Sequence, residues 1–290
     1  MPNIIFEKRL EADPRKDTNI YKLKAPRVNE ALLLQSARRF GLAGDRRVGQ
    51  LVLEPHEIGY TEGSFTLTLG KRSGAIRFMD MMKFQLDDGK TNIRMSDENA
   101  IKTAKEFIRK YDLASLRECK PLRVTRLRVG TLKVGARRAQ ERVIDVGVLF
   151  QRFVDGLPVF GPGGKMMVYL DKNRDLIGVD RVWRDISSVS RPVLKRELHT
   201  PEWAESSLKR SLARSTSPKI RVKEMQFGYF EGGICDIQRT MQPAYVMPLR
   251  LHAAEDKMVM RSLHVIPAAE RPVGRIMPRK QRRATEPVRR

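Results

Sequence analysis

Apolar residues recur at spacings of three and four in three separate segments, which is the period of an amphipathic helix. The three predicted helices span residues 27–42, 96–113 and 200–215. The second has the clearest start, because Ser96 is a typical N-cap residue and Asp97 places negative charge in the first turn. The third starts with Thr200 as the expected N-cap and Pro201 at the first helical position. All three helices are expected to bury one side against other parts of the fold.

Apolar and polar residues alternate in the segments that follow each helix, which is the pattern of half-buried strands. The predicted strands span 64–70, 75–84, 142–153, 164–171, 176–183, 219–230, 244–253 and 257–266. The pair Asp155-Gly156 is a strong signal for a tight hairpin turn. The connections are too short for parallel crossovers, so the strands are expected to pair in antiparallel hairpins.

The succession of one helix and several hairpins occurs three times, which predicts repeated small units. We therefore expect an α+β fold in which each unit is a helix packed on an antiparallel sheet. The predicted domains are an N-terminal α+β unit at 1–90, a second unit at 91–190 and a C-terminal unit at 191–268. A disordered basic tail is predicted at 269–290, since it contains three prolines and no apolar periodicity.

A glycine-rich run, Gly161-Pro162-Gly163-Gly164, stands directly before Lys165 and raises the question of phosphate binding. A phosphate-binding P-loop needs a glycine at the position of Val159 and a hydroxyl residue at the position of Met166. The sequence that follows is a strand pattern and not a helix. The glycines are therefore expected to serve a bulge or a close backbone approach within a hairpin.

The segment "FQRFVDGLPVFGPGGKMMVYLDKNRDLIGVDRVW" (150–183) resembles the PepSY-like modules, a pattern shared with the propeptide domains of thermolysin- and fungalysin-type proteases. The predicted helix 96–113 resembles the helix that precedes this hairpin in such modules. The resemblance implies a non-catalytic module that inhibits or chaperones a protease, or that senses and regulates at the cell envelope. Two features depart from that pattern, because no secretion signal is recognisable and no protease is attached.

The balance of charge is strongly basic, with 57 Lys and Arg against 34 Asp and Glu and a formal net charge of +23. The last twenty residues contain eight basic residues and one Glu, and a second basic stretch lies at 116–142. Such an excess attracts polyanions whatever the fold. The candidate polyanion-binding residues are Arg123, Arg126, Arg128, Arg137, Arg138, Arg279, Lys280, Arg282 and Arg283.

No catalytic pattern is visible in the sequence. Cys119 and Cys235 have no metal-ligand spacing, and whether they pair stays open. His252 and His264 lie on neighbouring predicted strands, either as two exposed side chains or as half of a metal site. Neither zinc-protease nor nucleophile-elbow motifs occur. We therefore expect a non-enzymatic protein with no cofactor and no metal.

Arg181 and Trp183 share one face of a predicted strand and form a candidate partner surface, or else simply pack stem over ring. The first functional hypothesis is a protein-interaction or regulatory module with a basic arm that docks on an acidic partner. The alternative is a sequence-nonspecific nucleic-acid-binding protein. No apolar run reaches the roughly 20 residues of a membrane span, although an anionic membrane surface is a compatible partner. The N-terminus lacks a signal sequence, which predicts the cytoplasm, or an extracytoplasmic location if a leader was removed.

Overall fold

The computed structural model describes residues 2–8, 16–84, 88–132, 135, 139–252 and 259–276. Strands hold 46% of these residues and helices 15%, and 14 of the strands join in one mixed sheet. The prediction of an α+β fold built from repeated helix-on-sheet units is therefore wrong. The hairpins do form, but they join edge to edge into a single large sheet.

The three predicted helices are confirmed as α1 (Glu30–Arg39), α2 (Asp97–Lys110) and α3 (Pro201–Leu212), with a short 3₁₀ turn η1 (Lys195–Glu197) before the last. Their predicted caps are also present. The Ser96 side chain accepts a hydrogen bond from the Asn99 backbone N–H at the start of α2. The Thr200 side chain accepts one from Trp203 N–H at the start of α3, where Pro201 is the first helical residue.

The large sheet runs in spatial order through β1 (Asn3–Phe6), β13 (Lys219–Val222), β16 (Pro243–His252), β14 (Gln226–Phe230), β9 (Leu157–Phe160), β8 (Gln140–Val154), β10 (Lys165–Leu170), β11 (Leu176–Val182), β6 (Ile76–Asp80), β5 (Phe65–Gly70), β4 (Glu57–Glu62) and β3 (Gln50–Leu53). Two further strands extend it, since β17 (Val259–Pro267) pairs with β16 and β7 (Cys119–Thr131) pairs with β8. A second sheet contains β12 (Ile186–Val193), β2 (Thr18–Leu23) and β15 (Thr240–Met241). The sheet is mixed because β1–β13 and β9–β14 are parallel pairs.

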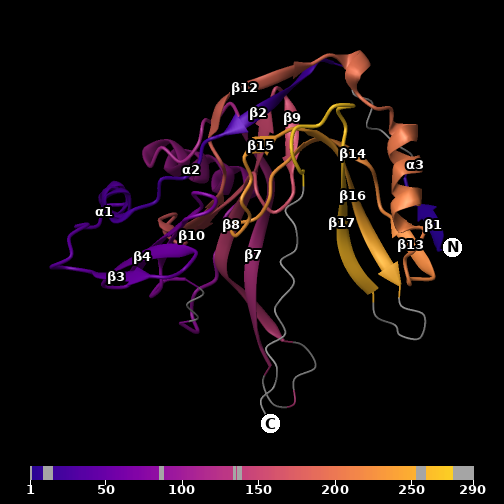
Figure 1. Cartoon of the computed structure of the whole chain (residues 1–290). Coiled ribbons are helices and arrows are strands. Elements are labelled where there is room, and N and C mark those ends of the chain that lie inside the picture. The colour runs from indigo at the N-terminus through magenta and orange to yellow at the C-terminus, as the bar shows by residue number, and fades with distance from the viewer. Residues whose placement is uncertain are drawn as a thin grey trace, which may run out of the picture.

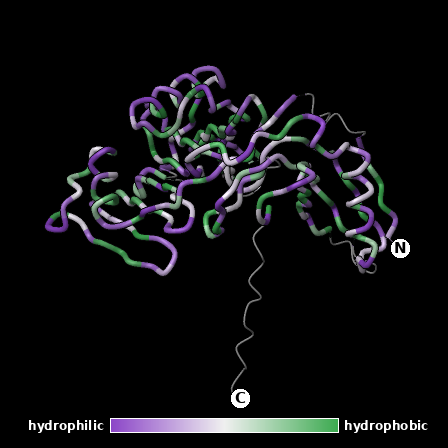
Figure 2. Tube along the Cα trace, turned by 45° about the horizontal axis from the view of Figure 1, so that its top comes forward, coloured by the Kyte–Doolittle hydropathy of each residue, from purple (hydrophilic) through white to green (hydrophobic). Residues whose placement is uncertain are grey.

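The molecule has the shape of an arch, with β2 and β12 crossing its top (Figure 1). We call the part of the sheet from β8 to β3, with α1 and α2, the N-terminal half, and the part from β14 to β1, with β17 and α3, the C-terminal half. Figure 2 shows the two halves from another direction. The largest core cluster, from Leu33 to Trp183, lies beneath α1 and α2, and a second cluster lies beneath α3. We call the opposite, helix-free face of the large sheet the inner face.

Strand β9 joins the two halves of the sheet. Its residue Pro158 is opposite Phe153 of β8, and Phe160 is opposite Phe230 of β14. Opposed residues point to the same side of a sheet, so the inner face continues from one half to the other. The parallel pairing of β9 with β14 joins residues about seventy positions apart in sequence, which no local pattern predicts.

The glycine-rich run 161–164 allows two backbone segments to come close together at this junction. A Cβ atom on Gly163 would lie 2.4 Å from the Gly232 carbonyl oxygen, and the Gly163 N–H donates to Glu231 O at 3.0 Å. Lys165 does not face a phosphate site, because its Nζ donates to Val159 O at 3.1 Å and burial lowers its pKa to about 8. The prediction of a close backbone approach is confirmed, although the neighbour is the loop after β14 and not the hairpin itself.

A buried ionic network holds the same junction. Arg184 is 1% exposed, and its Nη atoms donate to the carbonyl oxygens of Gly232, Gly233 and Asp236 at 2.8, 2.7 and 2.6 Å. Its guanidinium also pairs with the fully buried Glu231 at 3.4 Å. Arg152 lies 3.6 Å from the same carboxylate. Buried charges are tolerated only when they are paired and hydrogen-bonded in this way.

The predicted hairpin turn at Asp155-Gly156 is also confirmed, with positive φ angles of 53° and 74°. The Asp155 carboxylate accepts hydrogen bonds from the hydroxyls of Tyr229 (3.0 Å) and Tyr21. Burial and this carboxylate together raise the pKa of Tyr21 to about 12. Because Tyr21 belongs to β2, the turn fastens the small sheet to the large one.

Candidate partner-binding surface

A row of three arginines crosses the C-terminal half of the inner face. Arg221 of β13 is directly opposite Arg250 of β16, and Arg250 is directly opposite Arg261 of β17. All three point to the side that carries Val246 and Val265 and away from α3, because residues two apart on a strand share a face. We call these residues the arginine row.

The positive charge of the arginine row is poorly compensated. Among the described residues Arg221 has one ion pair, to Glu7 at 3.6 Å, and its Nε atom is buried without a hydrogen-bond partner there. Arg250 and Arg261 are exposed, and neither pairs with an acidic side chain anywhere in the described part of the chain. Like charges directly opposite each other destabilise a sheet. An anionic group bound across the row would remove that repulsion.

The positive end of the face extends two residues further along the strands. Lys219, His252 and Val259 form the next row of directly opposed residues. The His252 Nε2 atom is buried and has no hydrogen-bond partner among the described residues. The arginine row and this neighbouring row together present donors and no carboxylate.

Apolar side chains border the arginine row on the side of the junction. Phe230, Val246 and Val265 form a buried cluster, with Phe160 and Leu263 packed against it. Ile276 also belongs to this cluster, which fixes the described end of the chain against the inner face. The surface therefore changes from apolar near the junction to basic toward the free end of the strands.

Strand β17 leaves its outer edge open, because β16 is the only strand that pairs with it in the described residues. Ala268 N–H donates to Pro243 O, which marks this opposed pair as hydrogen-bonded. Since hydrogen-bonded and non-bonded pairs alternate along antiparallel strands, Val259, Arg261, Leu263 and Val265 direct their backbone groups outward. The open backbone groups thus belong to the residues whose side chains lie on the inner face.

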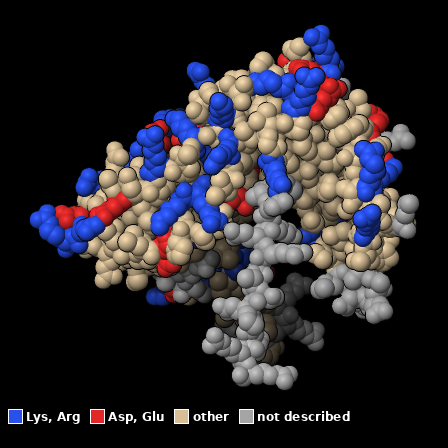
Figure 3. All heavy atoms as spheres, in the orientation of Figure 1, with Lys and Arg blue, Asp and Glu red and all other residues tan. Residues whose placement is uncertain are grey.

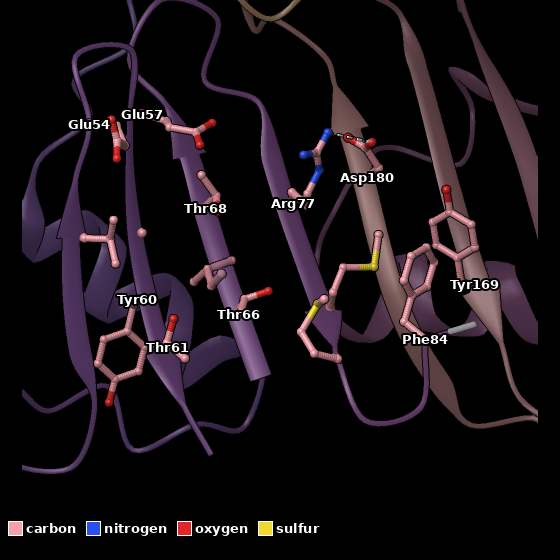
Figure 4. Close-up of a pocket in the computed structure, with 15 residues that line it drawn as sticks. Glu54, Glu57, Tyr60, Thr61, Thr66, Thr68, Arg77, Phe84, Tyr169 and Asp180 are labelled. Carbon is pink, nitrogen blue, oxygen red and sulfur yellow. Dashed lines mark hydrogen bonds and ion pairs between the residues drawn. The ribbon is translucent and has the colours of Figure 1, made fainter. Parts of the chain in front are cut away.

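A hollow of about 560 Å³ lies on the inner face of the N-terminal half (Figure 4). Figure 4 shows Thr66 and Thr68 along one strand, and the Arg77–Asp180 ion pair (3.3 Å) beyond them. Tyr169 packs edge-on against Phe84 at the other side, with ring centroids 5.3 Å apart. The Arg77 charge is already paired and the hollow is also lined by the carboxylates of Glu54 and Glu57, so it offers little for an anion.

Near this hollow, Asp145 of β8 is buried, and its Oδ1 atom has no partner among the described residues. Burial raises the pKa of Asp145 to about 6. Its carboxyl group faces no metal ligand set, since the described residues contain no group of three or more His, Cys, Asp or Glu side chains arranged to hold a metal ion. The buried carboxylate of Asp145 therefore lowers the stability of the fold when it is ionised, and its surroundings do not mark it as a catalytic acid.

Of the predicted polyanion-binding residues, the structure describes three, all on β7. Arg126 is tied to Asp97 at 2.6 Å and to Met95 O at 2.8 Å, and Arg128 pairs with Glu141 at 3.1 Å. Arg123 has no ion pair within the described residues and lies on the inner face opposite Leu149. Arg137, Arg138, Arg279, Lys280, Arg282 and Arg283 lie outside the described residues. Figure 3 shows Lys and Arg spread over both halves.

The predicted pair of Arg181 and Trp183 lies on the helix-bearing face of the sheet. Trp183 is buried in the core beneath α1 and α2, and the Arg181 guanidinium lies 5.9 Å from its ring centroid. The two side chains therefore share a face, as the alternation indicated. They line a groove rather than an open outer surface.

The histidines and cysteines do not assemble into a site. His252 points to the inner face, while His264 is opposite Met247 and contacts Ser211 of α3 on the other face. The two strand histidines therefore cannot share a metal ion. Cys119 is buried, Cys235 is exposed, and both are free thiols.

None of the described helices has the length and apolar character that crossing a membrane requires. No family model matches the chain, and no curated protein matches it. The resemblance of residues 150–183 to PepSY-like modules thus stays a prediction.

Among solved structures, the chain is similar to an uncharacterized protein from Eubacterium rectale. The superposition has a TM-score of 0.53 and 12% sequence identity, and it covers 95% of this chain and 90% of that one. At this identity the likeness concerns the fold alone. The arched sheet therefore has a counterpart of nearly the same extent in another protein.

Proposed function

We propose that this protein is a non-catalytic binding module that holds an extended, acidic segment of a partner protein along the open edge of β17. The observation that carries this proposal is the arginine row. Three guanidinium groups stand side by side, and within the described residues one carboxylate, that of Glu7 at 3.6 Å from Arg221, compensates them. A partner strand beside β17 would place an Asp or Glu opposite Arg261 and extend the row with the opposite charge.

The edge explains why a polypeptide fits better than a nucleic acid. The outward N–H and C=O groups of Arg261 and Leu263 match the hydrogen-bonding pattern of another strand, which gives affinity through the main chain. Guanidinium groups then select acidic side chains, since they form charge-assisted hydrogen bonds with carboxylates. A nucleic acid could bind the charges of the arginine row, but it would leave the outward N–H and C=O groups of β17 without hydrogen-bond partners.

The experiment measures binding of four probes by fluorescence anisotropy: a ten-residue peptide in which Glu alternates with Val and Thr, the same peptide with Gln for Glu, polyglutamate, and a twenty-nucleotide single-stranded DNA. The double variant R250Q/R261Q is expected to weaken binding of the Glu peptide by about tenfold or more, since hydrogen bonds to charged groups are involved. The matched control R196Q/R210Q removes two exposed arginines from η1 and α3 on the outer side. It is expected to change affinity less than about twofold.

A third variant, Leu263→Pro, removes one outward N–H without removing a hydrogen bond to β16, and Leu263→Ala is its control. Leu263→Pro should weaken the Glu peptide and leave polyglutamate and DNA unchanged. If DNA binds as tightly as the Glu peptide and Leu263→Pro affects neither, the polyanion function is correct and the proposed one is wrong. Equal binding of the Glu and Gln peptides would also contradict the proposal.

A further inference from the structure

A groove of about 820 Å³ lies on the helix-bearing face of the N-terminal half, far from the arginine row in the fold. It is bounded by α1, the linker that follows β2, the turn after α2, and the ends of β6 and β11. Its volume is within the range of small-molecule sites, which is roughly 300–1,000 Å³. Its wall contains a charged side chain whose position needs an explanation.

That side chain is Arg181, which is only 11% exposed. Its one ion pair within the described part of the chain is to Asp185 at 3.6 Å, which is too long for a good hydrogen bond, and the Asp185 side chain is 64% exposed. The Arg181 Nε atom is buried without a partner, and its guanidinium makes no hydrogen bond to another described residue. Burial lowers the pKa of Arg181, which shows that its charge is held at a cost.

The two neighbouring arginines show what a purely structural role requires. Arg184 donates to three carbonyl oxygens and pairs with Glu231. Arg152 donates to Glu118 at 3.0 Å and to Arg184 O at 2.6 Å. Arg181 has five N–H donors of its own and none of these partners. The donors of Arg181 are therefore available to a ligand in the groove.

The rest of the groove defines what that ligand is. The rim carries Lys24, Arg27 and Arg39 against Asp112 and Asp185, so positive charge is in excess there. The inner wall is apolar, and its main residues are Leu23, Val28, Leu69, Ile76, Leu113 and Trp183. An anionic head and an apolar body are the two features that such a groove would accommodate.

We propose that this groove binds a small organic carboxylate with an apolar body. The carboxylate oxygens accept hydrogen bonds from the planar guanidinium of Arg181, a geometry in which Arg and carboxylate match as two parallel bonds. The apolar body lies against Leu69, Ile76 and the ring of Trp183. No bond is made or broken, and the site is separate from the inner face.

The test uses the full chain with W203F as background, since Trp183 is then the only tryptophan. Octanoate should change the Trp183 fluorescence saturably, while octanamide, which lacks the charge, and acetate, which lacks the body, should bind at least about tenfold more weakly. Arg181→Gln should weaken octanoate by about tenfold or more. The control Arg77→Gln removes an exposed arginine from the other face of the neighbouring strand β6 and should leave binding unchanged.

A second pair of variants covers the case in which Arg181→Gln fails to fold. Leu32→Asp places a negative charge on the groove side of α1, and Gln35→Asp places the same charge on α1 away from the groove. The first should weaken octanoate and the second should not. The proposal fails if octanoate gives no saturable signal, if octanamide binds equally well, or if Leu32→Asp and Gln35→Asp have equal effects.

Discussion

At the scale of single residues, the partners of a charged side chain determine its role in this protein. Arg184, which follows β11, Arg128 of β7 and Arg250 of β16 are the same residue type in one fold. Arg184 is buried and its Nη atoms are hydrogen-bonded to carbonyl oxygens and paired with Glu231, Arg128 is exposed and paired with Glu141, and Arg250 is exposed between two other arginines. A buried paired charge supports the fold, an exposed pair contributes little, and an uncompensated row attracts a partner.

Asp145 gives a residue-scale prediction about pH. Its pKa is raised from 3.8 to about 6 in the folded chain by burial. The folded state therefore binds more protons than the unfolded state between these values, so this contribution to stability is complete below pH 3.8 and is lost as the pH rises through 6. Asp145→Asn should leave the free energy of unfolding unchanged near pH 3.5 and raise it by about 2–3 kcal/mol at pH 7 and above.

Urea unfolding of both proteins at pH 3.5, 5, 6 and 7.5 measures this effect. Asp180→Asn is the control, since it removes a carboxylate on the same face whose partner Arg77 is exposed, and it should change stability by less than about 1 kcal/mol. An Asp145→Asn variant less stable than the parent at pH 7.5 would show that the carboxylate is paired in solution.

At the scale of the elements, the two long edge strands of the sheet differ in how they avoid uncontrolled pairing. β7 contains Pro121 and two register shifts, and its exposed residues include Arg123 and Arg128. Prolines, bulges and charges of this kind protect an edge from pairing. β17 pairs with β16 over nine residues without a shift, and its one proline, Pro267, is the last residue of the strand. The basic residues of the stretch 116–142 thus protect the edge of β7 from pairing. The edge of β17 can still pair with a strand of a partner.

Another element-scale prediction concerns the junction of the two halves. Gly163→Ala should lower the free energy of unfolding by about 1–3 kcal/mol, because a new Cβ would lie 2.4 Å from Gly232 O and force the loops apart. Gly59→Ala is the matched control, since it lies in a strand and its new Cβ would be no nearer than 3.5 Å to any neighbour. Thermal and urea unfolding compare the two. Equal effects of the two substitutions would contradict the close approach.

At the scale of the whole molecule, one continuous sheet makes the two halves interdependent. The N-terminal strand β1 pairs with β13, and the described end of the chain packs beneath the C-terminal half. Val273 exchanges hydrogen bonds with the buried side chain of Gln242 (3.0 and 3.2 Å), and Ile276 closes the apolar cluster. Part of the segment predicted as a basic tail therefore contributes to the core.

Two truncated chains distinguish the effect of the positive charge of that segment on stability from the effect of its packing. A chain ending at Ile276 loses six basic residues and Glu286 but keeps all of these contacts. Ending the chain at Glu270 also removes the partners of Gln242 and a buried isoleucine side chain, which should cost about 2–4 kcal/mol. Calorimetric melting of the two truncated chains measures the difference. Equal melting temperatures would mean that residues 271–276 contribute nothing to stability.

Local patterns predicted those parts of the fold that depend on neighbours in sequence. The helices and their caps at Ser96 and Thr200, the Asp155-Gly156 turn and about half of the strands follow from periodicity and turn chemistry, which act over a few residues. Strands such as β2, β4 and β7 were not predicted. The glycine run was also correctly interpreted as a matter of chain geometry, because the phosphate-binding pattern fails at two defined positions. The same patterns could not show that the hairpins merge, since every hairpin edge offers the same hydrogen bonds to any other edge.

The sequence by itself determined where the three helices and about half of the strands form, and it determined the excess of positive charge. Only the tertiary structure decided which of the charges stand together. Each strand of the arginine row carries one central arginine in an ordinary alternating pattern, and the row exists because the register of β13, β16 and β17 aligns them. Register depends on contacts between segments tens of residues apart, and a shift of one residue would have turned the arginines to the opposite face.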